Sequence, residues 1–307
     1  MMVPQGRLQT RGAGPLISNH YRSLAALALL MAGSLSEMPA SAEARRAERV
    51  LIAANQAEIE AFVEGRGKTI IMLPSWARGA ADFDDMRGRL AKSGLRVITP
   101  NPRGIGASSG SLGNWAMDDQ ADDVVAVIRA TGKGPVTLLG HAYGNRVARA
   151  VASRYPELVC DVILVAAGGR IAPPPEVLKA VSDGADLHLP LAERREAVAK
   201  AHFAPGHDPG PWIDGWYPAV GMAQQASVTR DSPARWWNAG GRSILVIQPR
   251  QDAAAPSENA ELLKRENPAR VDLVYLENSG HAAFPEQPDE LERLITMRVK
   301  PNRRCEN

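Results

Sequence analysis

Continuous runs of apolar residues alternate with amphipathic stretches along most of the chain. Six such runs are found, at residues 68–75, 95–100, 135–141, 159–166, 243–248 and 271–276. They lack regular polar positions, and a strand without alternation is buried on both faces. The runs therefore predict the central strands of a mostly parallel sheet that is covered by helices.

Two opening strands and several helices complete the pattern. Residues 49–53 and 57–63 are predicted as strands, and the second alternates apolar with polar residues, which favours an edge position. Apolar residues at helical spacing predict helices at 81–93, 117–130, 145–154, 257–266 and 289–299. Strands alternating with helices indicate an α/β fold class, with a mostly parallel, doubly wound sheet of about eight strands.

One segment, residues 171–240, interrupts the alternation. It is rich in proline and glycine and contains four of the six tryptophans, at 212, 216, 236 and 237. We interpret it as an inserted lid, with the core at 43–170 and 241–300 and a flexible tail at 301–307. The tryptophans could give the insertion its own small core, could line an apolar pocket, or could do both.

Composition and charge narrow the class of ligand. The formal net charge is +2, and no basic stripe of the kind that binds nucleic acid is present. We expect a small-molecule substrate or ligand, without nucleic acid, cofactor or metal. Only Cys160 and Cys305 occur. Cys160 is expected to be a small buried residue, and a disulfide between the two stays open because their spacing does not indicate one.

The first 42 residues have the pattern of a secretory signal. Basic residues precede an apolar run at 24–35, which is shorter than the roughly 20 residues of a membrane span. Ala40, Ser41 and Ala42 then supply a small-residue cleavage site. The pattern predicts a periplasmic or secreted protein without a stable membrane anchor.

The stretch from Pro135 to Asn145 predicts a buried strand, a tight turn and the start of a helix. Gly140 and Gly144 flank the turn, where side chains would clash. The residue at the tip of such a turn is held above the sheet edge. In the nucleophile elbow G-x-S-x-G that residue is serine, whereas here it is Ala142.

Residues 68–294 resemble the α/β-hydrolase superfamily in its lid-bearing branch. Four features carry the resemblance: the loop at 102–108 (Pro-Arg-Gly-Ile-Gly-Ala-Ser), the elbow at 140–144 (Gly-His-Ala-Tyr-Gly), Asp252 after one late strand, and His281 after the last strand. Their order is that of the superfamily. The resemblance implies that His281 is a base oriented by Asp252, although a buried histidine and a turn aspartate are the simpler alternatives.

The resemblance also implies an oxyanion hole. The family commonly has His-Gly before the first donor, but this chain has Pro74 and Ser75 before Trp76. The implied donors are the backbone amides of Trp76 and Tyr143. Ser75 lies near enough in sequence to be considered as a replacement nucleophile, although an ordinary turn serine is the simpler interpretation.

Ala142 leaves the chemistry open, because a methyl group cannot attack a carbonyl. The chain could be an engineered serine-to-alanine variant, a natural enzyme that works without the elbow nucleophile, or a non-catalytic ligand-binding protein. We expect His141 to line the pocket or pack beside it, and we expect the histidines at 188, 202 and 207 to be solvated. The leading prediction is a hydrolase acting on a small, apolar ester, lactone or related carbonyl compound.

Overall fold

The computed structural model describes residues 47–131 and 134–302 of the chain. The predicted signal at 1–42 and the end of the predicted tail lie outside these residues. Among the described helices, none has both the length and the apolar character that a bilayer crossing requires. Cys160 is buried, as expected, and it is disulfide-bonded, which the spacing of the cysteines left open. Cys305 is outside the described part of the chain.

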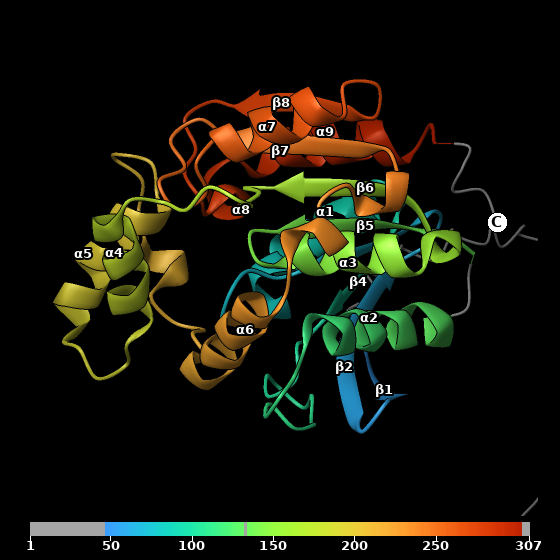
Figure 1. The fold of residues 1–307 in the computed structure, drawn as a ribbon, viewed down its shortest axis with the longest axis horizontal. Coiled ribbons are helices and arrows are strands. Elements are labelled where there is room, and N and C mark those ends of the chain that lie inside the picture. The colour runs from blue at the N-terminus through green and yellow to red at the C-terminus, as the bar shows by residue number, and fades with distance from the viewer. Residues whose placement is uncertain (1–46, 132–133, 303–307) are drawn as a thin grey trace, which may run out of the picture. The chain divides into compact units, whose positions relative to one another are not determined.

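The core is an eight-stranded sheet in the order β1-β2-β4-β3-β5-β6-β7-β8 (Figure 1). The strands are β1 Glu48–Ala54, β2 Ala57–Gly65, β3 Thr69–Leu73, β4 Arg96–Pro100, β5 Val136–His141, β6 Val159–Val165, β7 Ile244–Pro249 and β8 Val271–Leu276. Strands β1 and β2 run antiparallel to their neighbours, and the others pair in parallel. The predicted fold class is confirmed.

The predicted edge position of residues 57–63 is wrong. Strand β2 pairs with β1 on one side and with β4 on the other, so β1 is the edge strand. A two-residue turn, in which Gln56 has a positive φ of 54°, folds β1 back along β2. Alternation of apolar and polar residues indicates that one face of a strand is less buried. It does not indicate which edges of the strand are hydrogen-bonded to neighbours.

Helices cover both faces of the sheet. One apolar core contains α2 Met117–Thr131, α3 Gly144–Arg154 and α7 Glu258–Glu266. The other contains α1 Asp84–Lys92, α8 Ala283–Glu286 and α9 Pro288–Val299. Strands β3, β5, β6 and β7 are buried along their whole length, and the carboxyl ends of the parallel strands form a shared edge from which the site is built.

Three helices occupy the segment between β6 and β7: α4 Pro175–Ala185, α5 Leu191–His202 and α6 Pro218–Arg230 (Figure 1). The tryptophans of this segment divide between two cores. Trp212 and Trp216 form a small separate core against Trp76 and its neighbours. Trp236 and Trp237 instead pack into the main core beside α3. The aromatic residues of the segment thus do not form a single core of their own.

Candidate active site

The turn between β5 and α3 has the backbone of a nucleophile elbow. A β-carbon on Gly140 would lie 2.4 Å from Asn145 Cα, and one on Gly144 would lie 2.2 Å from Leu73 O, so neither position tolerates a side chain. Ala142, at the tip, has a φ of 48°, in the left-handed region that a non-glycine residue rarely adopts. Such strain costs of order 1–3 kcal/mol and is retained where the surrounding structure imposes it.

His281 and Asp252 lie together at the ends of the last two strands. The Nδ1 atom of His281 is 3.0 Å from both carboxylate oxygens of Asp252. The Asp252 side chain is fully buried and also accepts a hydrogen bond from Ala255 N at 2.8 Å. Since a carboxylate accepts, Nδ1 carries the proton and Nε2 carries a lone pair. Within the described residues, Nε2 has no hydrogen-bond partner.

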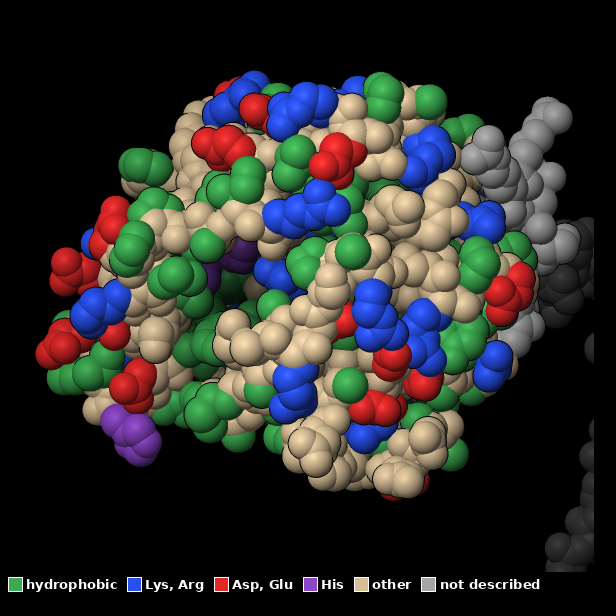
Figure 2. Space-filling model, in the orientation of Figure 1, with side chains coloured by type: hydrophobic (Ala, Val, Ile, Leu, Met, Phe, Trp, Pro, Cys, Tyr) green, Lys and Arg blue, Asp and Glu red, His purple; other side chains and the backbone are tan. Residues whose placement is uncertain are grey.

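A cavity of about 290 Å³ brings most of the predicted site residues together. Its lining consists of Trp76, Ala142, Tyr143, Arg146, Gly168, Leu178, Val181, Ser182, Gln225, Val228, Ala254, Ala255 and His281. Ser75 is buried and does not belong to this lining, while Asp252 lies behind His281. In Figure 2 a hollow opens beside the helices at the left, with histidine and basic atoms visible inside it.

The backbone amides of Trp76 and Tyr143 make no hydrogen bond to the part of the chain that the structure describes. Their side chains, in contrast, are tethered. The Trp76 indole donates to Gly221 O at 2.7 Å, and the Tyr143 hydroxyl donates to Gln120 Oε1 at 2.9 Å. Unpaired amides are uncommon in buried backbone and are the donor type that oxyanion holes use.

Two histidines lie beside His281: His141, which the sequence analysis expects to line the pocket or pack beside it, and His202, which it expects to be solvated. The rings of His141 and His202 each have their centroids 5.4 Å from that of His281. His141 Nε2 donates to the carbonyl oxygen of His281 at 2.8 Å, and burial lowers the pKa of His141 to about 3. In the described structure no group of His, Cys, Asp and Glu has the arrangement of a metal site.

The expectation that His202 is solvated is wrong. The residue is 4 % exposed, and burial lowers its pKa well below the usual value. Neither ring nitrogen has a partner among the described residues, and the ring lies against Trp212 and Trp216. The burial of His202 follows from the tertiary packing of α5, which the sequence does not show. His188 is exposed, as expected, and His207 is half-buried, with its Nδ1 atom 3.7 Å from Glu286 Oε1.

Glu286 is a second residue that sequence reasoning missed. It accepts hydrogen bonds from Gly280 N at 2.6 Å, from Ser279 Oγ at 3.2 Å and from Ala204 N at 2.7 Å. It thereby fastens the loop that carries His281 to the chain after α5. Burial raises the pKa of Glu286. No local motif surrounds it, so the sequence offers no signal for this role.

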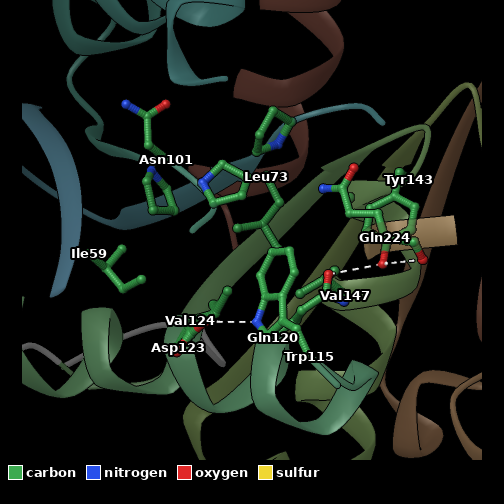
Figure 3. A pocket seen from close by; sticks show the side chains of 14 residues that line it. Ile59, Leu73, Asn101, Trp115, Gln120, Asp123, Val124, Tyr143, Val147 and Gln224 are labelled. Atoms are coloured by element: carbon green, nitrogen blue, oxygen red, sulfur yellow. Dashed lines mark hydrogen bonds between the residues drawn. The ribbon is translucent and has the colours of Figure 1, made fainter. Parts of the chain in front are cut away.

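A second, smaller cavity lies behind Tyr143, between α2 and the ends of β3 and β4. Figure 3 shows Trp115 projecting into it and bonded to Asp123, with the Tyr143 hydroxyl directed at Gln120. Its volume is about 40 Å³, and its lining is mainly apolar. A water needs roughly 10–15 Å³ of such space, so this cavity holds at most a few waters. Of these two cavities, only the one that contains His281 approaches the size of a small substrate.

Comparison with known proteins agrees with this geometry. Residues 68–208 match the family model of the alpha/beta hydrolase fold. The AB hydrolase superfamily protein YisY of Bacillus subtilis is 29 % identical over 255 residues, which cover 77 % of this chain and 94 % of that protein. A putative carbamate hydrolase, RutD, of Variovorax paradoxus is 33 % identical over 34 % of this chain and 40 % of its own length.

Solved structures have the same fold. An esterase from Exiguobacterium antarcticum superposes with a TM-score of 0.70 at 22 % identity, covering 82 % of this chain and all of that chain. The chain thus has the α/β-hydrolase fold, and its residues 68–208 are similar to that family. The fold and the relatives named as hydrolases support a hydrolase.

Proposed function

We propose that the protein hydrolyses a small, largely apolar ester, lactone or related carbonyl compound without a serine nucleophile. The observation that carries the proposal is the His281–Asp252 pair, whose unpaired Nε2 belongs to the same cavity as Ala142 and two unpaired backbone amides. These are the parts of a serine hydrolase site other than the attacking hydroxyl.

Water is the proposed nucleophile. A serine at the tip would add one oxygen atom, so alanine leaves volume there that a water molecule can occupy. His281 Nε2 takes a proton from this water as its oxygen attacks the carbonyl carbon, and Asp252 stabilises the imidazolium that forms. The amides of Trp76 and Tyr143 hold the oxyanion. As the carbon–leaving-group bond breaks, His281 returns the proton to the departing oxygen, giving an acid and an alcohol.

The cavity supports the substrate class. At about 290 Å³ it is near the small end of ligand pockets, which span roughly 300–1,000 Å³. Leu178 and Val181 of α4 and Val228 of α6 contribute apolar side chains to its wall. We propose on this basis that the segment 171–240 acts as a lid, since its helices supply one side of the cavity.

The test is hydrolysis of an ester and lactone panel by the purified chain and by two variants. His281→Ala should lose at least about 100-fold in kcat/KM, since it removes the base. The matched control, His188→Ala, changes an exposed histidine and should retain full activity. Absence of turnover across the panel, or unchanged turnover in His281→Ala, would overturn the proposal.

A second function is favoured by one observation, the methyl group of Ala142 at the nucleophile position. A ligand-binding protein could keep the cavity and dispense with turnover. In that case a ligand would raise the melting temperature and be recovered unchanged, and His281→Ala would alter affinity at most. Chromatography of the ligand after incubation separates this function from hydrolysis.

We also propose that the protein is exported. The support is the basic, apolar and small-residue pattern of residues 1–42. Expression of the full chain followed by fractionation and N-terminal sequencing tests it. Cleavage after Ala42 with the product outside the cytoplasm is expected, and an intact N-terminus in the cytoplasmic fraction would contradict export.

A further inference from the structure

Arg146 is the one Lys, Arg, Asp or Glu side chain in the lining of the cavity that holds His281. It lies four residues after Ala142, in the first turn of α3. Its guanidinium makes no hydrogen bond and no ion pair with the residues that the structure describes. The guanidinium carbon lies 5.5 Å from the centroid of the Trp236 ring.

Arg149, three residues after Arg146 in the same helix, is a useful comparison because its guanidinium is held by protein acceptors. Arg149 is 1 % exposed and donates to Gly168 O at 3.0 Å and to the side chain of Asn145. Arg170, also nearby, is paired with Glu266 at 2.9 Å. Arg146 therefore differs from both in having its donors directed to no protein acceptor.

The position of Arg146 is also electrostatically unfavourable without a ligand. A cation in the first turn of a helix opposes the helix dipole, and α3 has no acidic residue in that turn. Burial lowers the pKa of Arg146, since the cavity wall around it is mainly apolar. An anion bound in the cavity would relieve both costs, because a guanidinium binds a carboxylate through two parallel hydrogen bonds.

We propose that Arg146 binds a carboxylate of the substrate, so that the substrate is a small, mostly apolar carbonyl compound with one carboxylate group. The reaction in this proposal rests on the proposed hydrolase function, and the carboxylate of the substrate is inferred from Arg146. A single carboxylate matches the single cation of the lining, whereas a phosphate dianion would leave charge uncompensated. The carboxylate fixes one end of the molecule and leaves the scissile carbonyl to the amides of Trp76 and Tyr143.

The test compares two probes that differ at one end only: monomethyl glutarate has a carboxylate where dimethyl glutarate has a neutral methyl ester. Binding is measured by calorimetry in the His281→Ala background, where turnover should be at least about 100-fold slower. The monoester should bind roughly 10- to 100-fold more tightly, the range that a charge-assisted pair supplies. Arg146→Gln should abolish this preference, and Arg146→Lys should retain part of it. The matched control, Arg170→Gln, removes a nearby charge outside the lining and should leave the preference unchanged.

Equal binding of the two probes, binding of neither, or a preference that survives Arg146→Gln would overturn the carboxylate site. The two proposals fail separately. A preference for the monoester that depends on Arg146, without hydrolysis of either probe or of any member of the ester and lactone panel by the unmodified chain, would overturn the hydrolase function alone. Hydrolysis of the diester that depends on His281, without any preference for the monoester, would overturn the carboxylate site alone.

Discussion

The cavity over Ala142 and the loop at residues 102–108 both lie at the carboxyl ends of the sheet strands. They differ in whether their polar groups have hydrogen-bond partners. In the loop region, Arg103 donates two hydrogen bonds of 2.7 Å to Asp123, and Ser108 Oγ bonds both Glu60 N and Asn101 O at 2.9 Å. Buried polar groups normally have partners of this kind.

In the cavity, by contrast, donors and an acceptor are left unpaired within the described structure. They are the amides of Trp76 and Tyr143, the Nε2 atom of His281 and the guanidinium of Arg146. The difference separates polar groups that stabilise the fold from those that are available to a ligand. We call the paired groups of the loop region the closed cluster and the unpaired groups of the cavity the open cluster. The closed cluster contributes to stability, and the open cluster can contribute to binding. Three experiments test this distinction.

The largest effect is expected from Ala142→Ser, which adds the missing hydroxyl to the open cluster. Removal of the nucleophile from a serine hydrolase typically costs up to about 10⁶ in kcat. Because the proposed water reaction already supplies part of that rate, esterase activity should rise by less than this, roughly 10²- to 10³-fold. Intact-mass spectrometry during turnover of p-nitrophenyl acetate should show an acyl adduct in this variant and none in the unmodified chain. Ala142→Gly is the control without a hydroxyl. No gain and no adduct would mean that the tip is not positioned for attack.

The next effect concerns the closed cluster. Arg103→Met should lower the free energy of unfolding by about 3–5 kcal/mol, because it leaves the buried Asp123 carboxylate unpaired. Urea unfolding measures this, and activity per folded molecule should stay unchanged. Arg293→Met, which removes an exposed pair with Glu290, is the control and should leave the free energy of unfolding nearly unchanged. A loss of similar size in both variants would contradict the distinction.

The smallest effect is the pH dependence of stability around His281. Because burial lowers the pKa of His141 to about 3 in the folded protein, from its usual 6.5, the unfolded chain binds more protons below about pH 6.5 and the free energy of unfolding falls as pH falls. For His141 this amounts to about 2 kcal/mol between pH 7 and pH 5. His202 acts in the same direction, so His202→Phe should flatten the pH profile obtained by urea unfolding. Identical profiles for the two proteins would contradict the burial of this ring in solution.

Much of the candidate site was predictable because its constraints are local. Gly140 and Gly144 indicate a turn too tight for side chains. A β-carbon on either glycine would lie only 2.4 or 2.2 Å from a backbone atom. Asp252 and His281 each follow a predicted strand, and the carboxyl ends of parallel strands meet at one edge. The structure brings them to 3.0 Å, but their catalytic role stays a prediction.

The remaining features depend on contacts between distant segments. The edge position of β1, the burial of His202 and the loop anchor Glu286 arise from residues far apart in sequence, and no local pattern encodes them. The same holds for Arg146, which resembles Arg149 in sequence context and differs from it only in which side chains surround it.

The sequence by itself thus determined the sheet, the elbow and the order of the site residues, since apolar periodicity and glycine spacing act over a few residues. Only the tertiary structure decided which polar groups are paired. Hydrogen bonding and burial depend on what the folded chain brings within about 3 Å, and that distance is set by packing between segments.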